Sequence, residues 1–361
     1  MSPRSIGVAI VVVLLATIGV AAGRAAGAGG VVDAGRVLSI EHRPDGAYDL
    51  RYRSTSVSGK ATTETAVLWM PEGERNGEVV AWGHPTAGLA DHCAPSVAGN
   101  AEPPGLDELL VAGTTVVAPD YEGLGGPGVH PYLVGRSEGR SMLDALRAAR
   151  SVSGATGRSV AFGWSQGGHA ALFAGRLAPS YAPDVRLVGV AALAPVTDPA
   201  SLVVGPSVLA TQPGIVAMVA AGYKAAYPSL DTSDVLADPK SQLEGARTTC
   251  EAADVLKDTT TWLPTAAWRD KLEDNDAGAL GRIRVPVLIA QSEDDTLTPT
   301  SDTVRAYRRL CGSDSAVHLE RWRDTNHFTV AVAAKERLLE WLGDRLDGRP
   351  AAADCSQRTF G

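Results

Sequence analysis

The predicted fold depends first on the stretch SVAFGWSQGGHA, residues 159–170. Residues 159–162 have the apolar composition of a β-strand, and the residues from Gln166 to Leu177, rich in Ala and Gly, predict a helix. Between them, residues 163–167 match the pattern G-x-S-x-G, which places a serine on a sharp turn between strand and helix. A chain with 39 glycines can carry this pentapeptide by chance, so the strand and helix on either side carry the argument. Ser165 is therefore predicted to be a nucleophile.

Similar apolar runs recur on both sides of this stretch, with helical segments between them, one of which is predicted at 139–150. The runs with the composition of strands are residues 79–82, 114–118, 187–191 and 285–290. Strands that alternate with helices predict a mainly parallel sheet covered by helices on both faces. Earlier runs at 37–40 and 65–70 predict antiparallel strands that open the sheet.

The alternation breaks between Pro195 and about Gly281, where Pro and Gly separate short helical pieces. Within this region, Pro199 to Tyr223 carries no charged residue, which fits either a buried helical hairpin or an apolar lid over a binding cleft. On the second interpretation, we expect Val216 and Val219 to line an acyl site. We predict a catalytic core of residues 29–195 and 282–361, with a helical cap inserted at 196–281.

A nucleophilic serine needs a base, and in α/β-hydrolases the chain order is Ser, then Asp or Glu, then His. The loop after the strand at 285–290 carries Asp294 and Asp295, and the loop after a further predicted strand at 317–322 carries His327. We predict that His327 is the general base and that Asp295 orients its imidazole. Asp294 is the alternative acid, followed by Asp198 at the start of the insertion.

The other six histidines fit the role of the base less well. His169 lies one helical turn after Ser165 and is predicted to pack between helix and sheet, and His318 lies inside a predicted strand. The remaining four, His42, His84, His92 and His130, precede the nucleophile in the chain.

Ester hydrolysis also requires donors for the oxyanion, usually the amide after the nucleophile and one from a loop after an early strand. Gln166 supplies the first. The loop at 83–88 follows the strand at 79–82, and Pro85 in this loop has no N–H to give. Thr86 is therefore the predicted second donor.

The first 28 residues are typical of a secretory signal peptide. Arg4 precedes an uncharged apolar run from Ile6 to Ala22, and Ala26-Gly27-Ala28 offers a cleavage site. The alternative is an uncleaved membrane anchor, for which the run is short against a span of about 20 residues. The formal net charge is −8 with no block of Lys or Arg, which argues against a nucleic-acid partner.

Four cysteines lie in the predicted exported chain, at Cys93, Cys250, Cys311 and Cys355. None forms a C-x-x-C pair, and an even number at wide spacing in an oxidising compartment indicates two disulfides rather than a metal site. We predict no metal and no cofactor. Three connectivities are open on the sequence alone.

Four segments together resemble the secretory lipase family: GHPTAG at 83–88, DHCAPS at 91–96, VAPDYEGLG at 117–125 and GWSQGGHA at 163–170. The resemblance spans nearly the whole predicted mature chain. It implies an α/β-hydrolase fold with a large helical cap and a Ser-Asp-His triad, which falls here on Ser165, Asp295 and His327. Bacterial members often read H-G-T-T-G where this chain has Pro85 and Ala87, so the oxyanion loop departs from their pattern.

Position in the chain and the family resemblance favour the same disulfide pairing. Cys93 follows the oxyanion loop and Cys250 lies in the insertion, so a bridge between them would tie cap to core. Cys311 and Cys355 would tie the C-terminal tail to the region of His327. The family resemblance implies these same two ties.

We therefore expect a secreted serine hydrolase, a lipase or esterase that acts on acylglycerols or simpler carboxylic esters through an acyl-enzyme intermediate. The expected partners are a lipid or small ester substrate and, transiently, a lipid interface; nothing in the sequence specifies an oligomeric state. The alternatives are a serine peptidase or an acyltransferase of the same fold, or a catalytically inactive binding module.

Overall fold

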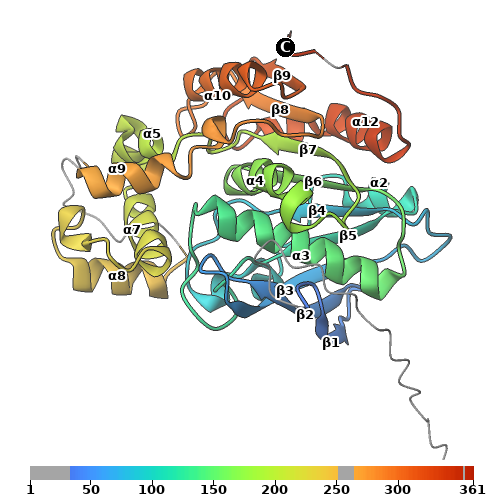
Figure 1. Cartoon of the computed structure of the whole chain (residues 1–361), viewed down its shortest axis with the longest axis horizontal. Coiled ribbons are helices and arrows are strands. Elements are labelled where there is room, and N and C mark those ends of the chain that lie inside the picture. Colours follow the sequence, from blue (N-terminus) through green and yellow to red (C-terminus); the bar gives the residue numbers. More distant parts are fainter. Residues whose placement is uncertain (1–32, 251–263, 353) are drawn as a thin grey trace, which may run out of the picture.

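A computed structural model describes residues 33–250, 264–352 and 354–361, and the predicted signal peptide at 1–28 lies outside them. A single ten-stranded sheet crosses the molecule in the order β1-β2-β3-β5-β4-β6-β7-β8-β9-β10 (Figure 1). The strands are β1 (Val37–His42), β2 (Tyr48–Thr55), β3 (Ala61–Trp69), β4 (Val79–Gly83), β5 (Thr115–Pro119), β6 (Ser159–Trp164), β7 (Leu187–Leu193), β8 (Val287–Ser292), β9 (Val317–Trp322) and β10 (Ser356–Phe360).

The sheet is antiparallel only at its beginning. The pairs β1–β2, β2–β3 and β3–β5 are antiparallel, and every pair from β5 to β10 is parallel. The prediction of a mainly parallel sheet opened by antiparallel strands is thus confirmed. Two strands were not predicted, β2 and β10. The sequence SQRTF of β10 has little apolar character because this strand is the outer edge of the sheet, where most of its side chains are exposed.

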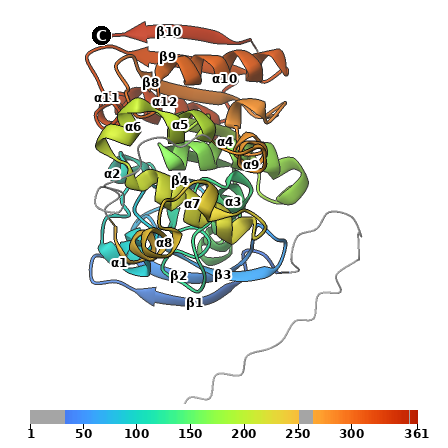
Figure 2. The ribbon, with the colours of Figure 1, turned by 90° about the vertical axis from the view of Figure 1, so that its left-hand side faces the viewer.

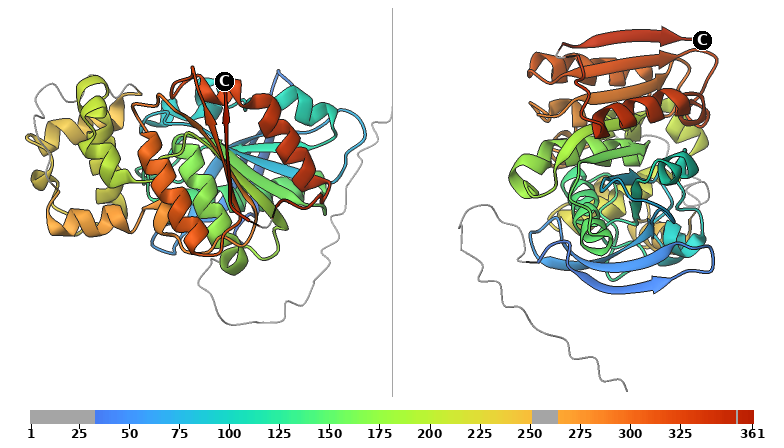
Figure 3. Two further views of the ribbon diagram at one scale, coloured as in Figure 1. Left: turned by 90° about the horizontal axis from the view of Figure 1, so that it is seen from above. Right: turned by 90° about the vertical axis from the view of Figure 1, so that its right-hand side faces the viewer.

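Helices cover both faces of the sheet, as Figure 3 shows. Helices α3 (Gly135–Ser153), α4 (Gln166–Tyr181) and α10 (Thr300–Gly312) pack on one face, and α2 (Leu106–Val111), α11 (Val330–Ala333) and α12 (Lys335–Leu346) pack on the other. Neighbouring residues of a strand point to opposite faces. In β5, for example, Val117 packs with α3 and α4 whereas Val116 packs with α2 and α12, and every position of this strand is buried.

Between β7 and β8 the described residues form helices and no strand. The helical elements are α5 (Pro199–Val204), α6 (Pro206–Thr211), α7 (Gly214–Ala226), η2 (Thr232–Asp234), α8 (Pro239–Thr248), α9 (Ala266–Glu273) and η4 (Ala277–Ala279). They gather at one end of the sheet (Figures 1 and 2). Their buried side chains form a separate apolar cluster that includes Val216, Val219 and Trp268 and extends to Tyr132 and Leu133 of the core. This helical insertion therefore has its own interior and packs against the loop before α3.

Two disulfides join distant parts of the chain, Cys93–Cys250 and Cys311–Cys355, and these are the expected pairs. The first connects η1 (Asp91–Cys93), just before α1 (Pro95–Ala98), to the chain that follows α8. The second fixes the residue before β10 to the end of α10. Bridges that close long loops typically contribute about 2–4 kcal/mol each.

Three carboxyl groups lie close together near α3: Glu64 of β3 and Asp144 of α3, both buried, and Glu122 of the loop before α3, which is partly buried. Glu64 is 1% exposed, and its Oε2 accepts a hydrogen bond from the Tyr52 hydroxyl at 3.2 Å. Burial, followed by repulsion from Glu122 and Asp144, raises the pKa of Glu64 to about 8. A carboxyl with a raised pKa in the folded state stabilises the fold most at low pH, and this contribution is lost as the pH rises toward 8.

We expect Glu64→Gln, which mimics the neutral acid, to raise the Tm relative to the wild type at pH 9 and to change it little at pH 5. The measurement is thermal unfolding of both proteins at the two pH values. The exposed Glu72 offers a matched control, since Glu72→Gln should shift the Tm little at either pH. An equal change in Tm on Glu64→Gln at both pH values would contradict a raised pKa of Glu64.

Candidate functional site

Ser165 lies on the turn between β6 and α4, with φ 57° and ψ −114°, a conformation that non-glycine residues rarely adopt. Two glycines permit this turn. A Cβ atom on Gly167 would lie 1.8 Å from the carbonyl oxygen of Gly83, and one on Gly163 would lie 2.3 Å from Gly167. Strand and helix approach each other too closely for any side chain at these positions, so the G-x-S-x-G spacing follows from packing as well as from backbone conformation.

His327 faces Ser165 from the loop after β9. Its Nε2 lies 3.0 Å from the Ser165 Oγ, although the two residues are 162 positions apart. The indole N–H of Trp164 donates to the carbonyl of His327 at 3.0 Å, and the two rings lie 5.7 Å apart. Trp164, the variable residue before the serine in the motif, thus holds the histidine loop in place.

Asp295 accepts a hydrogen bond from the other ring nitrogen of His327, with Oδ2 2.8 Å from Nδ1. Its Oδ1 accepts the backbone N–H groups of Leu297 at 2.9 Å and Thr298 at 2.8 Å. Burial alone would raise the pKa of Asp295, but hydrogen bonds and the charge interaction with His327 outweigh it, and the pKa is lowered. An ionised carboxylate is the form that can orient the imidazole and stabilise its cation.

The two alternative acids lie elsewhere. Asp294 is exposed, and its backbone N–H bonds to the Ser292 hydroxyl. Asp198 caps the N-terminus of α5 and forms an ion pair with Arg305 at 2.9 Å. Only Asp295 contacts His327 among the three acids that the sequence proposed.

Two polar residues that sequence reasoning missed complete the surroundings of the acid. The Thr298 hydroxyl lies 2.9 Å from Asp295 Oδ2 and 3.2 Å from His327 Nδ1. The Gln291 amide donates to Asp295 at 3.1 Å and to the carbonyl of Thr298 at 3.0 Å. Gln291 lies near the end of β8, and a glutamine within a buried apolar strand is the signal that could have identified it.

The two candidate oxyanion donors are both close to Ser165. The Gln166 amide opens α4, where the N-terminal dipole favours negative charge, and Thr86 lies in the loop after β4. Among the residues that the structure describes, neither N–H has an acceptor. The Thr86 hydroxyl is 2.7 Å from the Tyr132 hydroxyl, a hydrogen bond that holds the Thr86 side chain in place. Both amides thus remain available for an oxyanion.

A cavity of about 280 Å³ opens onto Ser165 and His327. Its lining combines apolar side chains with hydroxyl and amide groups and includes no Asp, Glu, Lys or Arg among the described residues. It consists of Pro85, Thr86, Tyr132, Trp164, Ser165, Val196, Leu202, Gln212, Ile215, Cys250, Leu297, Thr298, His327 and Phe328. Core loops supply one side and the cap supplies the other, including the half-cystine that ties the two together.

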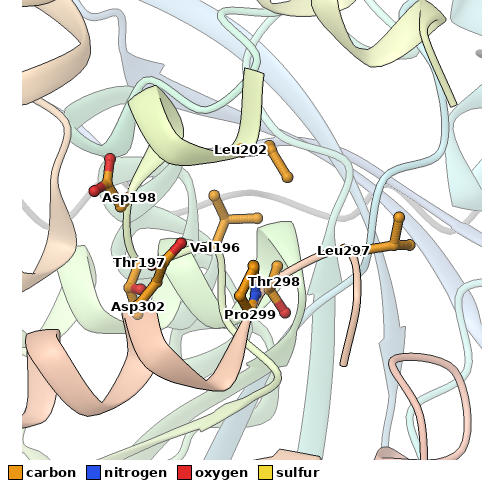
Figure 4. A pocket seen from close by; sticks show the side chains of 8 residues that line it. All are labelled: Val196, Thr197, Asp198, Leu202, Leu297, Thr298, Pro299 and Asp302. Atoms are coloured by element: carbon orange, nitrogen blue, oxygen red, sulfur yellow. The ribbon is translucent and has the colours of Figure 1, made fainter. Parts of the chain in front are cut away.

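A much smaller cavity of about 10 Å³ adjoins the first below α5. Figure 4 shows the side chains that line it, which come from the residues that follow β7, among them Val196 and Leu202, and from the residues that follow β8, among them Leu297 and Thr298. At its edge Arg305 bonds both Asp198 and Asp302 at 2.9 Å. The loop of the acid is therefore packed directly against the start of the cap.

The uncharged stretch from Pro199 to Tyr223 combines the two expected arrangements, since part of it lines the cavity and part of it is buried among helices. Leu202, Gln212 and Ile215 line the larger cavity, as a lid would. Val216 and Val219 do not line it, and that expectation was wrong: both are fully buried inside the cap. Helical periodicity explains the difference, because only one side of α7 faces the cavity.

His169 is also placed differently from the prediction. It is fully buried, as a packing residue would be, but it is held by hydrogen bonds: its Nδ1 lies 2.7 Å from the carboxyl group of Glu138 and its Nε2 3.0 Å from the carbonyl of Asn275. The sequence shows a histidine on the inner side of a helix, but only the fold brings Glu138, from α3, to meet it.

One group of potential metal ligands occurs within the described ranges, His92 with Cys93 and Cys250. The two sulfur atoms are bonded to each other and are not free thiolates. Among the helices of the described residues, none has both the length and the apolar character that a membrane crossing requires.

A mainly parallel sheet that carries a serine on a strand–helix turn, with an acid and a histidine on later loops, defines the α/β-hydrolase class. Within that class the chain belongs to the secretory lipase family, whose sequence profile matches residues 90–354. It is a carboxylic ester hydrolase. The family and fold expected from the sequence are thereby confirmed.

Known proteins resemble the chain over most of its length. Lipase A of Arthroderma benhamiae is 26% identical over 349 residues, which cover 87% of this chain and 73% of that lipase. The secreted triacylglycerol lipase LIP4 of Malassezia globosa is 25% identical, over 86% of this chain and 75% of its own. The crystal structure of Candida antarctica lipase A in its closed state superposes with a TM-score of 0.73 at 19% identity, over 89% of this chain and 84% of that one, and so shares the fold.

Proposed function

We propose that the protein is a secreted lipase or esterase in which Ser165, His327 and Asp295 form the catalytic triad. The observation that carries this proposal is the unbroken line of hydrogen bonds from Ser165 through His327 to Asp295, at 3.0 Å and 2.8 Å. Nδ1 must carry the ring proton because its partner is a carboxylate, which leaves Nε2 free to accept the proton of the serine.

The geometry supports acyl transfer in two stages. His327 takes the proton of Ser165 as the serine oxygen attacks the ester carbonyl, and the oxyanion is stabilised by the amides of Gln166 and Thr86. His327 then gives the proton to the departing alcohol. Water attacks the acyl-enzyme with the same histidine as base, which releases the acid and restores Ser165. Each step uses only protein groups and water.

The proposed substrates are acylglycerols or simpler carboxylic esters, as the names of the relatives suggest. The uncharged lining of the cavity supports neutral substrates over peptides with charged ends. Its volume of about 280 Å³ is at the lower end of the usual range for small-molecule sites, roughly 300–1,000 Å³. This volume favours short and medium acyl chains in the conformation described.

We further propose that residues 1–28 are a signal peptide and that residues 196–281 act as a cap. Secretion is supported by the family and by the two disulfides. Three exposed apolar side chains support transient contact with a lipid interface: Phe328, which is 57% exposed and lines the cavity, Val204 of α5 and Val332 of α11.

The test of the function is a series of p-nitrophenyl esters from acetate to palmitate, with triolein and peptide anilides alongside. We expect saturable ester turnover, with kcat/KM highest for short and medium chains, and labelling by a fluorophosphonate probe that Ser165→Ala abolishes. Faster cleavage of anilides than of esters would support a peptidase. Transfer of the acyl group to added alcohols in place of hydrolysis would support an acyltransferase. No labelling of the folded protein would identify an inactive binding module.

Ile215 should limit the acyl chain, because it comes from α7 and lines the cavity. We expect Ile215→Trp to fill part of this volume and to lower kcat/KM for octanoate and longer esters at least about tenfold, with acetate changed much less. The exposed Ala225 on the same helix gives the control, and Ala225→Trp should leave the chain-length profile as in the wild type. Equal losses on acetate and octanoate would contradict this role.

A further inference from the structure

A cluster of buried polar side chains lies directly behind the serine turn, and none of these side chains takes part in the steps described above. Its members are Glu138 of α3, His169 and Gln166 of α4, and His130 and Tyr121 from the loop between β5 and α3. All five are at most 1% exposed. Polar groups buried to this degree are costly unless they are fully hydrogen-bonded, so the bonds within the cluster show what it holds in place.

The cluster fixes the side chain of Gln166. The amide nitrogen Nε2 lies 2.8 Å from Glu138 Oε1 and 2.7 Å from His130 Nε2, so both of its hydrogens are used. The reversed orientation would place the amide oxygen against the carboxylate. The side chain therefore has one satisfied orientation. The main chain of Gln166, which carries the candidate oxyanion amide, is fixed both by the start of α4 and by this anchored side chain.

Both histidines are hydrogen-bonded through both ring nitrogens. Burial lowers the pKa of His130 to about 4, and the neutral ring donates from Nδ1 to the carbonyl of Glu122 at 2.9 Å, which leaves Nε2 as the acceptor for Gln166. His169 contacts the carboxyl group of Glu138 through Nδ1 at 2.7 Å and the carbonyl of Asn275 through Nε2 at 3.0 Å. Neither ring can therefore turn without losing a hydrogen bond inside the protein.

The same cluster supports the loop of the second donor. The Tyr121 hydroxyl donates to the carbonyl of His84 at 3.1 Å, two residues before Thr86. The Tyr121 ring is stacked on His130 with an interplanar angle of 10° and lies 4.4 Å from the His84 ring. One buried unit thus contacts both chain segments that carry the candidate oxyanion amides.

We propose that Glu138, with His130 and His169, is a positioning residue that holds the Gln166 amide in the direction of the oxyanion. The inference rests on the proposed triad mechanism. Oxyanion donors act only if they are already aimed at the place where charge develops, since a donor that must reorient gives back part of its contribution. A residue with this role should affect the transition state far more than the binding of the ester.

The experiment compares Glu138→Ala and Glu138→Gln in the secreted full-length enzyme. Alanine leaves Gln166, His169 and the backbone N–H of Leu133 without their acceptor, whereas glutamine accepts from Gln166 and Leu133 and donates to a neutral His169. We expect Glu138→Ala to lower kcat about 10–100-fold with KM changed less than about twofold, on the scale of a weakened oxyanion donor. Glu138→Gln should recover kcat to within about fivefold of the wild type.

The second measurement is the inhibition constant of a boronic acid that forms a tetrahedral adduct with the serine. A merely structural role of Glu138 would leave this constant unchanged. Glu138→Ala should weaken its inhibition constant by the same factor as kcat, and Glu138→Gln should restore it. Tyr181→Phe is the matched control: it removes a hydrogen bond of 2.6 Å to Asp144 at the far end of α4, so kcat and inhibition should stay within about twofold of the wild type.

The positioning role would be overturned if Glu138→Ala kept the wild-type kcat, or if Glu138→Gln lost as much kcat as Glu138→Ala. The triad proposal would stand in either case, because it depends on ester turnover by the wild type. If Glu138→Ala does not fold, Gln166→Met makes the same test from the other side, because it keeps the backbone amide and removes only the anchored side-chain amide. We expect the same loss of kcat, and an unchanged kcat in this variant would again overturn the proposal.

Discussion

Ser165→Ala and His327→Ala should each lower kcat for ester hydrolysis by about 10⁴-fold or more, with the protein still folded and secreted. The first variant removes the atom that forms the acyl-enzyme, and the second removes the ring nitrogen that lies 3.0 Å from the serine oxygen and accepts its proton. The two residues act as one unit, so the double variant should be little slower than either single variant.

The measurement is kcat on p-nitrophenyl butyrate, with the Tm of each variant as a check on folding. His92, an exposed histidine near the oxyanion loop, gives the control, since His92→Ala should keep kcat within about twofold of the wild type. A His327→Ala enzyme that keeps a tenth of the activity would show that another group serves as the base.

Asp295→Asn should lower kcat by about 10³–10⁴-fold, although asparagine has nearly the same shape. The carboxylate holds the proton on Nδ1 of His327 and stabilises the imidazolium, and its pKa is lowered, so it stays ionised below the usual range of an aspartate. An amide in its place loses the charge and can present N–H to Nδ1, which favours the wrong tautomer and turns Nε2 from acceptor to donor.

Asp294→Asn is the matched control for this second prediction, because Asp294 is the adjacent residue in the chain and is exposed. We expect a change in kcat of less than about threefold. Both variants can be compared on the same ester, with the Tm measured to separate loss of fold from loss of charge. A larger loss in Asp294→Asn than in Asp295→Asn would show that the acid has been assigned to the wrong residue.

The fold was predictable because its signals are local. A parallel strand buried on both faces carries a continuous apolar run, as Val116–Ala118 does in β5 and Val287–Ala290 in β8, so the strands of the core can be found from short windows of sequence. The edge strand β10 carries no such signal, since its pairing with β9 depends on backbone hydrogen bonds rather than on apolar side chains. Its position became clear only from the pairing itself.

The sequence by itself determined the serine turn, the order of Ser165, Asp295 and His327, and the even number of cysteines, because each depends on residue type and position along the chain. Only the tertiary structure decided which groups meet. Trp164 against the loop of His327 and Glu138 behind Gln166 are contacts between separate elements. Thr298 and Gln291 are near Asp295 in the chain, but their hydrogen bonds to it depend on how the loop after β8 folds. The side of α7 that faces the cavity was also left open, since a helix that is apolar all round does not reveal which side packs against the core and which lines a site.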